Sequence, residues 1–153
     1  MKFICPLLAV ADISVSRSFY EHVLQQKVIL DLGANVTFEG NFAIQSNFAE
    51  LMDMYEGEIL KEANNFELVF EEEDYDGFLE RLKNIDEIIY VHEDKQYEWG
   101  QRVIRFLDPD LHIVEVGESM KSVVKRFINQ GLSVEETAKR TMHPVDFVRE
   151  CLS

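Results

Sequence analysis

An internal repeat constrains the fold of this chain more than any other feature. Two segments, each an apolar strand followed by an aspartate and an amphipathic helix, are placed so that Asp12 and Asp74 stand 62 residues apart. Aspartate suits the position before a helix, because its carboxylate accepts hydrogen bonds from the free N–H groups of the first turn. Three further strand-like runs follow each helix. The sequence therefore predicts two copies of one strand–helix–three-strand plan.

Alternating apolar residues and turn residues divide each copy into elements. In the first copy we expect strands at 3–10, 27–32, 35–39 and 42–46, and helices from Ser14 and over 48–63. In the second copy we expect strands at 66–74, 87–92, 101–107 and 112–117, and a helix after Asp74. Val15, Phe19 and Val23 recur at every fourth position and Tyr20 and Leu24 widen this stripe, which predicts the buried face of the first helix.

Composition excludes several classes of function. The chain has 153 residues and a formal net charge of −14, so phosphate-rich partners and anionic membrane surfaces are disfavoured for the whole chain. No apolar run approaches the roughly 18 residues of a membrane span. Two cysteines, Cys5 and Cys151, are too few for the disulfide framework of a small secreted domain. We therefore expect reduced thiols and a cytoplasmic protein that binds neither membrane nor nucleic acid.

Two stretches carry a resemblance to a known family: "LLAVADISVSRSFYEHVL" near the start and "WGQRVIRFLDPDLHIVEV" near residue 100. With the repeated plan, they make residues 1–118 resemble the vicinal oxygen chelate superfamily, the group of glyoxalases, bleomycin resistance proteins and extradiol dioxygenases. The resemblance implies an α+β fold in which two βαβββ modules form a curled mixed sheet around a cleft. It also implies that a small molecule binds in the cleft, often through a metal ion.

The resemblance further assigns four strand positions that hold the metal in that superfamily. They fall here on Cys5, Gln45, Glu67 and Glu115. Glyoxalase I-like members carry His or Gln, Glu, His and Glu, so both histidines are replaced here. Carboxylates with an amide suit a hard cation and a thiolate suits a soft one, so the mixed set suits neither. A divalent metal on Gln45, Glu67 and Glu115 is possible but not favoured, and no other cofactor is indicated.

Arg105 alternates with Ile104 and Phe106 in its strand, which directs it to the same face of the sheet as Glu115. There Arg105 either pairs with the acidic side chains or holds the carboxylate of a ligand through its planar fork. Tyr97 and Trp99 precede the same strand. They either stack on a flat ligand or close the sheet as apolar plugs.

Residues 119–153 form a separate helical tail of six basic and four acidic residues. A helix is expected over 120–130, a capping box at Ser133 and Glu136 starts a second, and Pro144 suits the first turn of a third. This order resembles a degenerate helix-turn-helix. Its last helix carries Asp146 and Glu150 against Arg149, which fits a phosphate backbone badly. We expect a cap on the domain or an interaction surface, and a homodimer.

Two classes of function follow. The first is a glyoxalase- or bleomycin-resistance-like protein that binds a small molecule without the usual metal site. The alternative is a metal-dependent lyase or dioxygenase of the same superfamily with an atypical ligand set. Glu67 and Glu115 are the candidate catalytic residues; Cys5, Gln45, Arg105, Tyr97 and Trp99 are the candidate ligand-binding residues. If both glutamates lie in one partly buried place, their like charges raise the pKa of at least one.

Overall fold

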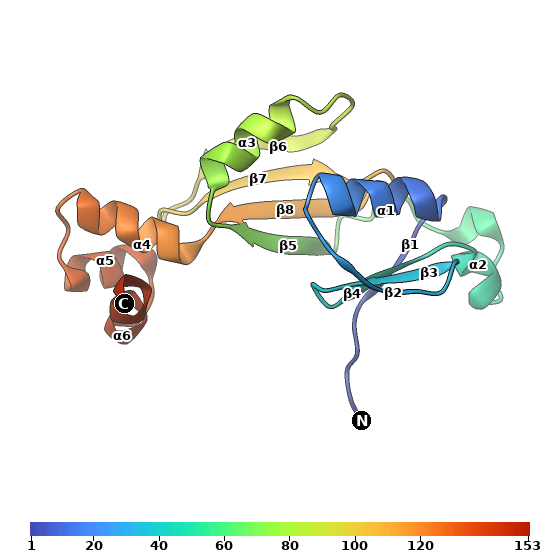
Figure 1. The fold of residues 1–153 in the computed structure, drawn as a ribbon, viewed down its shortest axis with the longest axis horizontal. Coiled ribbons are helices and arrows are strands. Elements are labelled where there is room, and N and C mark those ends of the chain that lie inside the picture. Colours follow the sequence, from blue (N-terminus) through green and yellow to red (C-terminus); the bar gives the residue numbers. More distant parts are fainter. The chain divides into compact units, whose positions relative to one another are not determined.

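Each copy of the repeat folds into an open four-stranded mixed sheet with one helix after its first strand (Figure 1). The computed structural model describes residues 1–153 and divides into two compact units, Met1–Phe66 with Leu107–His112 and Glu67–Phe106 with Ile113–Ser153. We call them the first and the second unit. The first contains β1 (Leu7–Ala9), α1 (Ile13–His22), β2 (Val28–Asp31), β3 (Asn35–Phe38), β4 (Phe42–Gln45), α2 (Phe48–Leu51) and the 3₁₀ turn η1 (Glu56–Glu58).

The second unit contains β5 (Glu67–Glu72), α3 (Tyr75–Lys83), β6 (Tyr90–Gln96), β7 (Arg102–Leu107, except its last residue), β8 (Ile113–Glu118), α4 (Met120–Asn129), α5 (Val134–Thr141) and α6 (Val145–Leu152). The strand orders are β1-β4-β3-β2 and β5-β8-β7-β6, and the first strand of each sheet pairs parallel with the fourth. The predicted α+β class and its two βαβββ copies are therefore confirmed. No helix combines the length and the apolar composition needed to cross a bilayer.

The repeated aspartates begin the two helices as predicted. The carboxylate of Asp12 accepts hydrogen bonds from the backbone N–H of Ser14 (2.8 Å) and Val15 (3.2 Å). Asp74 accepts one from the N–H of Gly77 at 3.2 Å. A side chain that satisfies these free donors stabilises a helix by about 1 kcal/mol and sets where it begins.

The expected buried face of α1 is confirmed at Tyr20, Val23 and Leu24 but is wrong for Val15. Val15 is 52% exposed, whereas Ser16, Tyr20 and Val23 are buried. Tyr20 packs on Phe38 of β3 with ring centroids 5.4 Å apart. Positions 16, 20 and 23 lie on one side of a helix with 3.6 residues per turn, and Val15 lies at the edge of that side. Because Ser16 is polar, the spacing of apolar residues did not show that this position is buried.

Two expected elements are shorter in the structure. The first strand begins at Leu7 instead of residue 3, and Phe3 and Ile4 are 81% and 69% exposed. The expected helix over 48–63 is wrong: α2 ends at Leu51 and only η1 follows. Most of the apolar side chains of this segment cover no surface, since Leu51, Met52, Tyr55 and Leu60 are all exposed. An isolated helix without a buried face is unstable in water.

The second sheet has one covered and one open face. Leu68, Phe106 and Val114 are buried on the face against α3, where Phe78 lies 6.3 Å from Phe106 between ring centroids. Residues alternating with these, among them Glu67, Arg105 and Glu115, point to the opposite face. Strand β6 covers Tyr90–Gln96 instead of the expected 87–92, so it extends as far as the residue before Tyr97.

The three C-terminal helices follow β8 and pack on one another (Figure 1). Their expected boundaries are confirmed. Helix α4 ends at Asn129, the capping box of Ser133 and Glu136 begins α5, and Pro144 directly precedes α6. One apolar cluster joins α4, α5 and α6 through Val124, Ala138, Val148 and Cys151.

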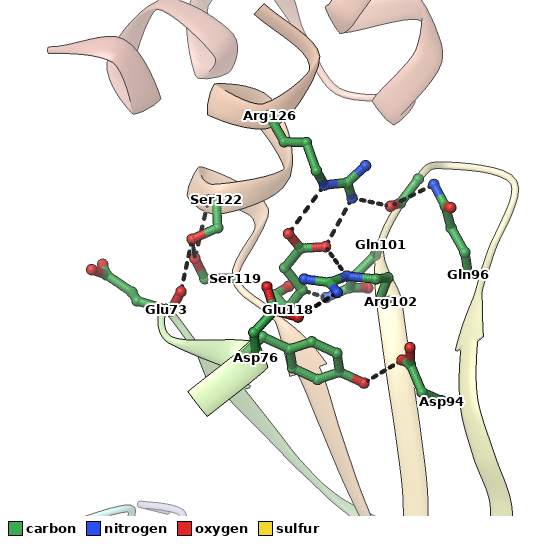
Figure 2. Close-up of polar contacts among 12 residues, drawn as sticks. Glu73, Asp76, Asp94, Gln96, Gln101, Arg102, Glu118, Ser119, Ser122 and Arg126 are labelled. Atoms are coloured by element: carbon green, nitrogen blue, oxygen red, sulfur yellow. Dashed lines mark hydrogen bonds and ion pairs between the residues drawn. The ribbon is translucent and has the colours of Figure 1, made fainter. Parts of the chain in front are cut away.

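A buried carboxylate, Glu118, connects α4 to the sheet (Figure 2). Its oxygens accept hydrogen bonds from Arg126 of α4 at 2.8 and 3.3 Å and from Arg102 of β7 at 3.2 Å. Arg126 also donates to the backbone oxygen of Gly100 at 2.7 Å. Gly100 has φ +88°, and a Cβ there would lie 2.3 Å from the ring of Phe127. The first C-terminal helix is thus held by charge and by close contact.

We expect Glu118→Gln to lower the free energy of unfolding at about pH 7 by about 3 kcal/mol, because Arg126 loses its only carboxylate partner and Arg102 keeps only Asp76. Burial alone would raise the pKa of Glu118, but the bonds from Arg126 and Arg102 outweigh it and hold the pKa below the ordinary 4.5. The stabilisation is therefore present above about pH 4.5 and is lost as the pH falls through the pKa of the folded protein.

Urea denaturation of wild type, Glu118→Gln and the exposed control Glu98→Gln measures this effect. The difference between wild type and Glu118→Gln should shrink from about pH 6 to about pH 3. A difference that stays constant over that range, or an equal loss in the control, would contradict the assignment.

Candidate functional site

The open face of the second sheet carries a polar cluster centred on Arg105. We define the Arg105 cluster as Arg105, Glu67, Glu115, His92 and Tyr97, all in the second unit. Strands β5, β8, β7 and β6 contribute Glu67, Glu115, Arg105 and His92, and Tyr97 follows β6. Four neighbouring strands thus each contribute one side chain. Alternation along the strands is what puts them on one face.

The guanidinium of Arg105 uses all three of its nitrogens. Nε donates to Oε2 of Glu67 at 2.8 Å, and Nη2 donates to Oε1 of Glu67 at 3.4 Å and to Oε2 of Glu115. Nη1 donates to the hydroxyl of Tyr97 at 2.6 Å. The predicted ion pairing between Arg105 and acidic side chains is therefore present. These bonds nearly exhaust the five N–H groups of a guanidinium.

His92 completes the cluster, and the sequence did not identify it as a site residue. Its Nε2 lies 3.0 Å from Nη1 of Arg105, and its Nδ1 lies 2.8 Å from the backbone oxygen of Glu93. Arginine has no lone pair to offer, so Nε2 is the acceptor and Nδ1 carries the proton. The pairing of His92 with Arg105 across β6 and β7 creates this contact. Register across irregular strands is not readable from the sequence, because β6 slips twice against β7.

Glu115 is the most buried acid of the cluster, with a side chain 12% exposed against 33% for Glu67. Burial raises the pKa of Glu115, the positive charge of Arg105 opposes this, and the negative charge of Glu67 adds to it. The net effect is a pKa of Glu115 above its ordinary value. The hydrogen bond to Glu67 raises the pKa of Arg105 above its already high range. The guanidinium therefore stays charged, while Glu115 holds its proton more readily than an ordinary glutamate.

The other two expected positions belong to the first unit. Gln45 ends β4, where its Oε1 accepts a hydrogen bond from Asn35 at 3.0 Å and its Nε2 donates to the backbone oxygen of Ser46 at 2.7 Å. The pair Asn35–Gln45 repeats, in neutral form, the pair Arg105–Glu115 of the second sheet. This supports the alignment of Gln45 with Glu115. Cys5 is a free, half-buried thiol that precedes β1.

The register of the two sheets changes which residue of the first copy corresponds to Glu67. Ala9 pairs with Gln45, whereas Val69 pairs with Glu115. Glu67 stands two residues before Val69, so the residue at the equivalent register of the first sheet is Leu7. The repeat offset of 62 had put Cys5 there instead. The offset measured between helix caps therefore does not hold along the first strands.

Trp99 has a different environment from the cluster. Its ring stacks on Tyr97 with centroids 4.7 Å apart, and its indole N–H donates to Oε1 of Gln101 at 2.9 Å. The ring also packs against the buried cluster of Met120, Val123 and Phe127. Trp99 thereby joins the polar cluster to the C-terminal helices. A ligand-stacking role for Tyr97 and Trp99 remains a prediction.

The placement of these side chains does not fit a divalent metal at the positions that the resemblance assigns. Both carboxylates, Glu67 and Glu115, already share one permanent cation, and a metal ion within their reach would be repelled by Arg105. Both polar groups of the Gln45 amide are engaged within the first unit. Nor does any group of three or more His, Cys, Asp or Glu side chains have an arrangement able to hold a metal ion.

Solved structures with similar folds support the architecture. A protein of unknown function from Agrobacterium tumefaciens str. C58 is 36% identical, with a TM-score of 0.67, and the match covers 78% of this chain and 94% of that one. A glyoxalase/bleomycin resistance protein/dioxygenase family enzyme from Burkholderia phytofirmans PsJN is 14% identical, with a TM-score of 0.64 and 75% and 96% coverage.

A lactoylglutathione lyase from Agrobacterium tumefaciens is 21% identical, with a TM-score of 0.58, and the match covers 77% of this chain and 93% of that one. At this identity it shows the fold alone. The comparison with curated proteins gives no match. The family described as "Glyoxalase-like domain" matches residues 3–121. The chain therefore belongs to the glyoxalase-like family of the vicinal oxygen chelate superfamily.

Proposed function

We propose that this protein binds a small organic molecule at the Arg105 cluster, through amine or hydroxyl donors of the ligand and without a resident divalent metal. One observation carries the proposal. Oε2 of Glu115 is bonded to Arg105, while no protein donor is bonded to Oε1 and that atom is not sealed from solvent. An anchored carboxylate with one open oxygen is a preorganised acceptor for a ligand donor.

The charge of the cluster decides which ligands it favours. Two carboxylates and one guanidinium leave a net charge of −1 when both acids are ionised, and the chain as a whole carries −14. An anionic ligand would meet this potential and would have to displace Glu67 or Glu115 from Arg105. A cation or a neutral donor meets neither obstacle. Arg105 therefore acts as the internal cation that positions the two carboxylates, in preference to holding a ligand carboxylate.

A second candidate function is acid–base catalysis by Glu115, favoured by the raised pKa of this residue. A carboxyl that exchanges its proton nearer to neutral pH can serve as general acid or base for a bound ligand. Both functions would use Glu115, so the size of its pKa shift distinguishes them: catalysis requires a pKa nearer to neutral pH, and binding does not. If the measured pKa of Glu115 is that of an ordinary carboxylic acid, catalysis is excluded and binding is the remaining function.

We expect Arg105→Met to raise the pKa of Glu115 further, because Arg105 is the group that opposes the effects of burial and of Glu67. NMR titration of the side-chain carboxyl carbons measures this pKa in wild type and variant. Arg81→Met, which removes an exposed arginine from α3, is the matched control and should leave the titration of Glu115 unchanged. An unchanged or lowered pKa in Arg105→Met would show that Glu115 does not depend on Arg105.

Ligand preference is measured with two probes of similar size and opposite charge, 2-phenylethylamine and phenylacetate. The amine should perturb the NMR signals of the Glu115 carboxyl and of Tyr97, and Glu115→Gln should weaken its binding about tenfold by removing the charged acceptor. Glu71→Gln, an exposed acid on β5, is the control and should bind like wild type. Phenylacetate binding at these residues, with no binding of the amine, would contradict the proposal.

A further inference from the structure

The first unit contains a cavity that none of the residues assigned by the family resemblance lines. This cavity of about 760 Å³ is lined by the end of β1 and the start of its connection to α1, by the segment from Asn47 to Lys61, and by Asp110 and His112. We call it the His112 cavity. Its apolar lining residues are Ala9, Val10, Ala11, Phe48, Ala49, Met54, Ile59 and Leu60. The volume is that of a small-molecule site.

A buried aspartate fixes the orientation of His112. Asp108 is 2% exposed, and its Oδ2 contacts Nδ1 of His112 at 2.9 Å and accepts a hydrogen bond from the Tyr20 hydroxyl at 2.7 Å. Its Oδ1 accepts from the backbone N–H groups of Asp110 (2.9 Å) and His112 (2.8 Å). The Tyr20 hydroxyl and two backbone N–H groups donate to this carboxylate, so it is also the acceptor in its contact with Nδ1. Nδ1 of His112 must therefore carry a proton.

This leaves Nε2 as the open nitrogen of His112, because no protein group is hydrogen-bonded to it. The neighbouring carboxylate of Asp110 is held in place by two protein donors: its oxygens accept from the N–H of Ala11 at 2.7 Å and from the Ser16 hydroxyl at 2.6 Å. The turn therefore offers a ligand one polar atom with a defined direction. That atom belongs to a residue on the wall of a cavity with both apolar and polar lining.

We propose that the His112 cavity binds a weak organic acid, a carboxylic acid or a phenol, that has an apolar body and places its acidic oxygen on Nε2 of His112. A weak acid can hydrogen-bond to the neutral and to the charged ring of His112. The neutral ring accepts the O–H of the protonated ligand, and the charged ring donates its N–H to the ligand anion, so a single proton between Nε2 and the ligand oxygen serves both cases. An amine in its usual cationic form can donate only to the neutral ring.

The groups around His112 support this choice. Burial lowers the pKa of His112, but the hydrogen bond and charge of Asp108, with the charge of Asp110, outweigh it and raise the pKa above the ordinary value. The charged ring, a donor to anions, is thereby favoured. Lys61 of the wall is exposed, so solvent screens its positive charge. Glu50 and Glu56, the other acids of the wall, are exposed, so solvent screens their charges.

The test uses wild-type protein labelled with ¹⁵N, with naphthalene-2-carboxylate as the probe and neutral naphthalene-2-carboxamide as its isostere. Proton–nitrogen correlation spectra of the histidine rings report the state of each nitrogen. Saturable addition of the carboxylate should shift Nε2 of His112 and leave the rings of His22, His92 and His143 unchanged. This readout needs no variant, and it separates the cavity from the Arg105 cluster, which contains His92.

Affinity provides the second arm of the test. His112→Phe should weaken binding of the carboxylate about tenfold or more and change binding of the carboxamide less than about twofold. His22→Phe, an exposed position of the same unit, should bind both probes like wild type. The proposal is overturned by the absence of saturable carboxylate binding up to about 10 mM. It is also overturned by binding that leaves the Nε2 signal of His112 unchanged.

Discussion

The guanidinium of Arg105 is the interaction on which the open face of the second sheet depends. It contacts a side chain from β5, one from β8 and one from β6, so a single group on β7 reaches all three remaining strands of the sheet. Without it, Glu67 and Glu115 would present two like charges to each other on a partly buried face. The strand pairing would then have to hold two carboxylates that repel. A permanent cation fixed between them removes that cost and leaves one acceptor oxygen open.

The two copies of the repeat have diverged at this position. The first sheet has the neutral pair Asn35–Gln45 where the second has the charged pair Arg105–Glu115. The neutral pair closes on itself and on the backbone of Ser46, which leaves little for a ligand. The open polar atom of the first unit lies elsewhere, on His112 at the turn before β8. The two units thus offer ligands different chemistry, acceptor oxygens in one and an imidazole nitrogen in the other.

Local signals predicted most of the fold, and contacts between distant residues limited the prediction. Asp12, Asp74 and Ser133 act on the first turn of their own helices, so their roles were readable from spacing alone. The helix expected over 48–63 failed, because most of its apolar residues cover no surface, which a local pattern does not report. Arg105 was predicted from alternation within its strand. His92 was not, because its contact with Arg105 depends on the irregular register of β6.

The central claim is that Arg105 occupies, as a fixed cation, the place between Glu67 and Glu115, with His92 beside it. Removing it should leave two carboxylates and an imidazole, a donor set that suits Zn²⁺. The most direct measurement is calorimetric titration of Zn²⁺ into wild type, Arg105→Ala and the double variant Arg105→Ala/Glu115→Gln. We predict one Zn²⁺ site in Arg105→Ala that is absent from the other two. A stoichiometric Zn²⁺ site in wild type, or no site in Arg105→Ala, would contradict this role of Arg105.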